Sequence, residues 1–143
     1  MPQEDDLVGT WKLVSAWSKR PNGELVGLYG EHPIGFLTYT KEGRMAVIIS
    51  DSDRASLSTE DDLVAPNAER AAAFSTFGAY AGTFRIEADR VIHHVEISSL
   101  QNWVGTDQVR WMKLEGNRLV LWPPKGPMGG EQREYELIWE RLR

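Results

Sequence analysis

The sequence predicts an all-β fold, an eight-stranded (or larger) antiparallel up-and-down β-barrel with one short helix between the third and fourth strands. Three observations carry this prediction. Apolar and polar residues alternate with a period of two along most of the chain, which is the spacing of half-buried strands. Short and long connections alternate along the chain. The six tryptophans are large aromatic side chains of the kind that suit β-structure and apolar interiors.

The alternation places each strand in turn and leaves room for one helix. The strands are expected at 9–17, 34–40, 44–50, 79–87, 90–100, 107–115, 118–122 and 133–141. The helix is expected over 67–77, because Asn67 can cap its N-terminus, Glu69 suits its first turn and Gly78 can end it.

The connections indicate how the barrel is built. The short ones, at 41–43, 88–89 and 116–117, are typical of tight hairpins. The long ones are 18–33, 51–78, 101–106 and 123–132. Because every second connection of a meander lies at the same end, we expect a tightly turned base and a looped mouth. The loops 51–78 and 123–132 are then either lids over the mouth or ordinary surface loops.

The hairpin registers place one set of side chains on the inner face of the sheet. This set comprises Trp11, Leu13, Ser15, Trp17, Leu37, Tyr39, Met45, Val47, Ile49, Tyr80, Phe84, Ile86, Val91, His93, Val95, Ile97, Gln108, Arg110, Met112, Leu114, Leu119, Leu121, Tyr135, Leu137, Trp139 and Arg141. Ile97 is expected opposite Tyr80. A hairpin closed by 101–106 is expected to pair Ile97 with Arg110 and Ser99 with Gln108.

The outer face is expected to carry an apolar patch on adjoining strands. Its members are Val109, Trp111, Val120, Trp122 and Ile138. Such a patch indicates either a contact between two copies of the chain or cover from the helix, and we expect a homodimer ahead of a monomer.

Three polar side chains interrupt the apolar inner face: His93, Gln108 and Arg110. Within the strands, no inward position carries Asp or Glu, so Arg110 has no carboxylate partner inside the barrel. A buried guanidinium must then find tyrosine hydroxyls, Gln108, water, or a ligand with a carbonyl or an acidic group.

Length and composition bound the class of protein. The 143 residues are expected to form one domain, 1–143. A net charge of −5 without a basic run argues against nucleic acid. The acidic start leads into no apolar segment, and the longest apolar stretch, 45–49, is too short to cross a bilayer, so we expect a cytoplasmic protein without membrane contact. The absence of cysteine excludes disulfides and thiol chemistry.

Metal and cofactor sites are not expected. His93, His94 and Glu96 have the residue types of a metal site, but neighbours in a strand point to opposite faces, so the two histidines cannot easily share one ion. No nucleophile elbow, phosphate-binding glycine loop or dinucleotide fingerprint is present.

The sequence resembles the bacterial and fungal lipocalin-like domain family over nearly its whole length. The matching segments are 7–13, 35–40, 43–45, 80–84, 93–96, 102–110 and 137–141, of which 93–110 is the most specific. The segment Gly9-Thr10-Trp11 also resembles the opening of lipocalins proper, which implies that Trp11 packs at the closed base under Arg141. In one departure, Gln101 stands where a proline often precedes Asn-Trp in the family. The resemblance implies a small β-barrel with an internal pocket, and it does not imply one activity.

Three functions follow from this barrel. In the favoured hypothesis it binds a small, largely apolar molecule with a carbonyl or acidic group. The expected ligand-binding residues are Tyr39, Met45, Tyr80, Phe84, His93, Trp103, Gln108, Arg110 and Met112. The alternative is a cofactor-independent cyclase, isomerase or dehydratase of polyketide-like or terpenoid natural products, with His93, Arg110, Tyr39 and Tyr80 as catalytic residues. The third is a structural or interaction module with a filled barrel.

Overall fold

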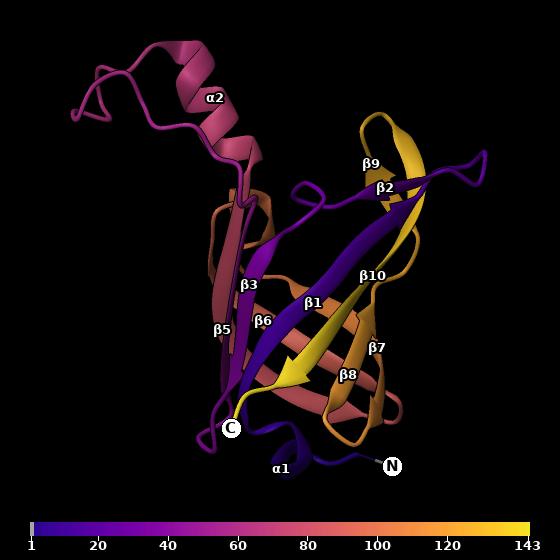
Figure 1. The fold of residues 1–143 in the computed structure, drawn as a ribbon. Helices are drawn as coiled ribbons and strands as arrows, with labels where there is room; N and C mark the ends of the chain where they lie inside the picture. Colours follow the sequence, from indigo (N-terminus) through magenta and orange to yellow (C-terminus); the bar gives the residue numbers. More distant parts are fainter. Residues whose placement is uncertain (1) are drawn as a thin grey trace.

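The computed structural model describes residues 2–143 and is a closed antiparallel β-barrel (Figure 1). Its strands are β1 (Gly9–Lys19), β2 (Leu25–Gly27), β3 (Ile34–Tyr39), β4 (Arg44–Ser50), β5 (Phe77–Glu87), β6 (Arg90–Ser98), β7 (Asp107–Glu115), β8 (Arg118–Trp122), β9 (Gly126–Met128) and β10 (Glu131–Arg141). One sheet runs in the order β2-β1-β3-β4-β5-β6-β7-β8-β10-β9, and the pairing of β1 with β10 closes it. The predicted up-and-down barrel is therefore confirmed, with β2 and β9 as short additions at the rim.

Three helical segments accompany the strands: α1 (Glu4–Leu7), α2 (Asn67–Ser75) and the 3-10 turn η1 (Gln101–Trp103). The predicted helix is confirmed, although no side chain caps its start and it ends two residues early because Phe77 already belongs to β5. The alternation missed β2 and β9, because three-residue strands are too short to show a period.

The base of the barrel is sealed by Trp11, which has no exposed surface. Its indole nitrogen donates to the carbonyl of Leu7 in α1 at 2.9 Å. The guanidinium of Arg141 lies 4.2 Å from the centre of the Trp11 ring and donates to the carbonyl of Val8 at 2.7 Å. The predicted packing of Trp11 under Arg141 is confirmed, and α1 lies at the end where the tight turns gather (Figure 1).

A β-bulge in β1 overturns one inward assignment. The pairing with β10 skips Val14, so the alternation of β1 changes phase after that residue. Ala16 and Ser18 then point inward and are buried, whereas Trp17 points outward with 42% of its surface exposed. The prediction of an inward Trp17 is wrong because an extra residue moves all later side chains to the opposite face.

A second bulge, between β5 and β6, contradicts another predicted inward assignment. The pairing skips Glu96, so Tyr80 lies opposite Ser98 rather than Ile97. Ile97 points outward and is 68% exposed, which contradicts its predicted inward position. The bulge depends on Gly82, because a Cβ there would lie 1.8 Å from a carbonyl oxygen of the facing strand.

The pairing of β6 with β7 also differs from the prediction. Arg110 lies opposite Val91 rather than Ile97, a difference of six residues, and Gln108 lies opposite His93. The reason is that residues 99–106 do not form a hairpin turn close to the strand ends. They contain η1, and the residue pairs between the two strands extend only from Arg90–Trp111 to His94–Asp107.

The predicted outer patch is only partly exposed. Trp111 and Trp122 lie opposite each other on β7 and β8, and both are half-buried. A homodimer through this face stays a prediction. Within residues 2–143 there is no helix with the length and apolar character needed to cross a membrane.

Candidate ligand-binding cavity

A cavity of about 430 Å³ lies inside the barrel and reaches the mouth, so the barrel is not filled. Apolar side chains from β3, β4, β8 and β10, including Leu37, Val47, Leu121 and Leu137, form much of its wall. A cavity of this size and composition suits a small organic molecule.

The polar part of the wall centres on His93, which is 1% exposed. Its Nε2 lies 2.7 Å from the hydroxyl oxygen of Tyr39 on β3, and its Nδ1 lies 2.7 Å from that of Tyr80 on β5. The closed barrel brings these three strands together around one ring. Both ring nitrogens of His93 are therefore engaged by tyrosines.

Burial sets the charge of this group. Desolvation by burial is the larger cause and the positive charge of Arg110 the smaller one, and together they lower the pKa of His93 to about 3. Burial raises the pKa of Tyr80, and it raises the pKa of Tyr39 well above its ordinary value. At neutral pH the histidine is therefore uncharged and both tyrosines keep their protons.

Arg110 is the charged side chain of the cavity wall and is 7% exposed. One guanidinium nitrogen donates to the carbonyl of Val109 at 2.9 Å. Within residues 2–143, no carboxylate forms an ion pair with it. An enclosed positive charge without a counter-charge is costly, and an anionic or strongly dipolar ligand would relieve that cost.

Trp103 covers the polar wall from the mouth. Its ring meets Tyr80 edge-on with 5.5 Å between ring centres, and the Arg110 guanidinium lies 5.7 Å from the centre of the Trp103 ring. The η1 turn, in the loop between β6 and β7, supplies this side chain. Trp103, Tyr80 and Arg110 thus share one corner of the cavity.

The structure brings together only part of the predicted ligand-binding set. Tyr80, His93, Trp103 and Arg110 line the cavity. The others lie outside its lining: Tyr39, Met45, Phe84 and Met112 are buried in the core, and Gln108 donates to the Thr106 hydroxyl at 2.9 Å. Tyr39 is nevertheless connected to the cavity, because its hydroxyl contacts Nε2 of His93, which lines it.

The predicted ligand-binding set left out several residues that line the cavity. Tyr29 follows β2 and has a φ of 57°, in the region that disfavours side chains. A Cβ on Gly78 would lie 2.3 Å from the Tyr29 hydroxyl, so this glycine makes room for the ring. Tyr135 and Trp139 also line the cavity, and the indole N–H of Trp139 is buried with no hydrogen-bond partner among the described residues. The two-residue period indicated Tyr135 and Trp139 as inward, whereas nothing in the sequence pointed to Tyr29.

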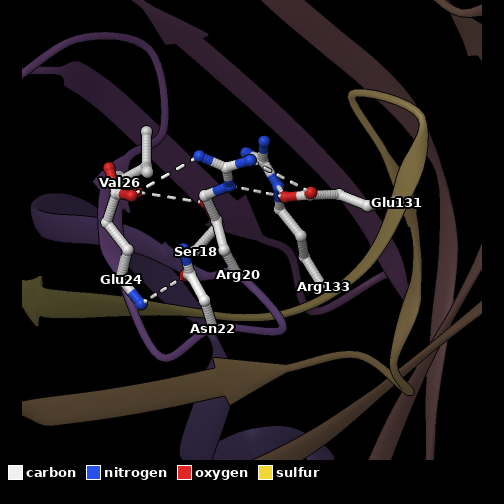
Figure 2. Close-up of polar contacts among 7 residues, drawn as sticks. All are labelled: Ser18, Arg20, Asn22, Glu24, Val26, Glu131 and Arg133. Carbon is white, nitrogen blue, oxygen red and sulfur yellow. Dashed lines mark hydrogen bonds and ion pairs between the residues drawn. The ribbon is translucent and has the colours of Figure 1, made fainter.

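The β9–β10 hairpin at the mouth is tied to β1 by a charged cluster (Figure 2). Glu131 accepts from Arg20 at 2.7 and 3.2 Å and from Arg133 at 2.8 Å. Hydrogen bonds and the positive charge of the two arginines lower the pKa of Glu131 to about 2. The cluster holds the hairpin in place, and Met128 at its tip lines the cavity.

The segment that carries α2 is placed differently. In Figure 1 it extends away from the barrel, and α2 has no buried residue. Only its last residue, Ser75, lines the cavity. That either long loop acts as a lid stays a prediction.

The outer side of the same wall carries a separate polar group. His94 Nδ1 lies 2.8 Å from one carboxylate oxygen of Asp107, and a guanidinium nitrogen of Arg85 lies 3.3 Å from the other. In the described chain, no three His, Cys, Asp or Glu side chains gather in a way that would hold a metal ion.

The model of the lipocalin-like domain matches residues 8–142. The chain belongs to this family. Its barrel is similar to that of a lipocalin-like protein from Bacteroides uniformis, with a TM-score of 0.51 over 96% of this chain and 99% of that one, at 12% identity. This likeness concerns the fold.

A curated relative is more similar in sequence. The 4'-hydroxy-3'-methoxypropiophenone carrier protein ppsC of Aspergillus oryzae is 38% identical over 84 residues, which cover 52% of this chain and 75% of the relative. The lipocalin-like family and this carrier both fit small-molecule binding by the present chain.

Proposed function

We propose that this protein is a carrier that binds a small, largely apolar molecule inside its barrel, with a carbonyl or acidic oxygen of that molecule facing Arg110. The observation that carries the proposal is the buried guanidinium in a mostly apolar cavity of about 430 Å³, with no carboxylate paired to it in residues 2–143. Such a group favours an electron-rich oxygen and rejects a second cation.

The relative supports a particular kind of ligand. Its name describes an aromatic ketone that also bears a phenolic hydroxyl and a methoxy group. A flat aromatic body suits a cavity with Trp103 and Tyr80 at its mouth, and the ketone or phenolic oxygen suits Arg110. We therefore propose an aromatic ketone of similar size as the ligand class.

The geometry favours a carrier over an enzyme. Both nitrogens of His93 are occupied, and its pKa of about 3 makes it a weak base at neutral pH. No Asp, Glu or Lys is found among the residues that line the cavity in the described chain. The predicted cyclase, isomerase or dehydratase would need a proton acceptor that these lining residues do not supply.

Two measurements test the proposal. Native mass spectrometry of freshly purified protein is expected to show a bound small molecule. Titration with 4'-hydroxyacetophenone is expected to quench the fluorescence of Trp103 and Trp139, and Arg110→Met is expected to weaken this binding by roughly tenfold or more, as for the loss of a charge-assisted hydrogen bond. Arg85→Met, on the outer surface, is the matched control. Undiminished binding by a folded Arg110→Met variant would contradict the proposal.

A further inference from the structure

We infer that the cavity binds the acidic oxygen of its ligand as an anion, held by Arg110 and by the Tyr80 hydroxyl, and that Tyr39 acts through His93 to keep the Tyr80 proton directed at the ligand. This inference rests on the proposed carrier function and deepens it. It makes Tyr39 and His93 positioning residues, and it names an ionisable phenol as the class of ligand.

The neutral ring of His93 has two possible tautomers. A neutral imidazole donates from one nitrogen and accepts at the other. Tyr39 is 1% exposed, and the hydrogen bond of its hydroxyl within residues 2–143 is the one to Nε2. If Nε2 carried the proton, the Tyr39 hydroxyl proton would be buried without an acceptor, which is unfavourable. Tyr39 therefore donates to Nε2, and the proton of the ring lies on Nδ1.

Nδ1–H of His93 donates to the Tyr80 oxygen at 2.7 Å, so Tyr80 cannot donate back to the ring. In the described chain its hydroxyl proton has no other acceptor, and Tyr80 lines the cavity. The hydroxyl proton of Tyr80 is thus available to a ligand. Tyr39, His93 and Tyr80 form a chain of hydrogen bonds that all run in one direction, towards the cavity.

Arg110 only donates, and it meets the same face of the cavity as Tyr80, because both contact the Trp103 ring. The unpartnered indole N–H of Trp139 adds a further donor beside the cavity. Arg110 and the Tyr80 hydroxyl around one oxygen, the first of them charged, favour that oxygen in its ionised form. A phenol that binds here releases its proton to the solvent.

The tautomer is tested by NMR on protein labelled with ¹⁵N-histidine. The double variant His32→Gln/His94→Gln leaves His93 as the single histidine, and both replaced side chains lie at the surface. The expected spectrum shows a protonated Nδ1 and an unprotonated Nε2. Tyr39→Phe is expected to give a mixture of both tautomers. A protonated Nε2 in the double variant, or an unchanged tautomer in Tyr39→Phe, would overturn the role of Tyr39.

The bound anion is tested with 4'-hydroxyacetophenone, whose phenolate absorbs at longer wavelength than its phenol. Its pKa is expected to fall on binding by about 1–2 units, as for an acid placed beside a guanidinium. Arg110→Met is expected to abolish the shift, Arg110→Lys to keep most of it and Tyr80→Phe to reduce it. Arg85→Met is the control that keeps it.

The matched probe 4'-methoxyacetophenone, which cannot ionise, separates this inference from the carrier function. Tighter binding of the hydroxy probe at a pH above its bound pKa supports the inference. Equal binding of both probes without a pKa shift would leave the carrier function standing and overturn the anion site. Failure of both probes to bind would overturn the proposed function, and the inference with it.

Discussion

His93 and His94 are neighbours in the chain, yet they lie in two different environments. His93 is 1% exposed, touches two tyrosines and has its pKa lowered to about 3. The His94 side chain is 45% exposed and pairs with Asp107 on the outer surface. Because successive side chains of a strand point to opposite faces, two consecutive histidines lie in a buried, neutral network and in a solvent-exposed pair with a carboxylate.

The largest expected difference between the two sites is in stability. His93→Ala removes the hydrogen-bond partner of two buried tyrosine hydroxyls and leaves a cavity, so we expect a loss of about 3–5 kcal/mol in the free energy of unfolding. His94→Ala removes a surface pair and is expected to cost less than about 1 kcal/mol. Urea unfolding of the two variants measures both losses. Equal losses would show that the polar network does not contribute as inferred.

The pH dependence of stability should come next in size. The pKa of His93 is about 3 in the folded protein and 6.5 in an ordinary environment, so the unfolded chain binds more protons between these values. The stability that comes from a neutral His93 is fully present above about pH 6.5 and is lost as the pH falls. The free energy of unfolding then changes by up to about 1.4 kcal/mol per pH unit. The groups that face it do not titrate there, since Tyr39 and Tyr80 ionise only in base and Arg110 stays charged.

This slope is measured by urea unfolding at several pH values between about 4.5 and 7, above the range in which most carboxylates titrate. His93→Gln is expected to flatten it, and His94→Gln serves as the control on the outer face. A slope that persists unchanged in His93→Gln would mean that another group is responsible.

Arg110 offers a test in which stability and binding move in opposite directions. Arg110→Met removes a buried charge without a counter-charge, so we expect the ligand-free protein to gain about 1 kcal/mol in unfolding free energy while it loses affinity for the probe ligand. Arg85→Met, on the outer face, is expected to change both quantities little. Thermal unfolding with and without 4'-hydroxyacetophenone measures both. A clear destabilisation of the ligand-free Arg110→Met variant would indicate that Arg110 serves the fold.

The smallest effect is expected at the mouth, where charged contacts are exposed to solvent. Glu131→Gln weakens the pairing with Arg20 and Arg133 that is drawn in Figure 2. We expect faster hydrogen exchange in residues 126–133, with global unfolding unchanged. Acidification should have the same local result only as the pH falls towards about 2, where Glu131 takes up its proton. Unchanged exchange in Glu131→Gln would show that the hairpin is held by other contacts.

Much of the barrel could be predicted from the sequence, and the errors have identifiable causes. The tight hairpins and the packing of Trp11 under Arg141 agree with the structure. The inward assignments of Trp17 and Ile97 are wrong because bulges change the phase of a strand without changing its composition. Only Gly82 signals one of these bulges, since no other residue fits there.

The candidate site was only partly predictable, because periodicity indicates the face on which a side chain lies and not the side chains that it contacts. Periodicity identified Tyr80, His93 and Arg110 as inward, and all three line the cavity. It did not indicate that His93 bridges Tyr39 and Tyr80, because that contact joins strands β3, β5 and β6 across the barrel. Nor did it indicate Tyr29, which reaches the cavity from a loop.

The apolar faces of most strands, the turns and the polar side chains of the inner face could be assigned from the sequence, since they depend on the local period of the backbone. The partners of those side chains depend on the three-dimensional fold. Closure of the barrel placed two tyrosines against His93 and set Arg110 beside Trp103. Whether a polar group is paired, shifted in pKa or open to a ligand depends on its neighbours in space, which sequence spacing does not specify.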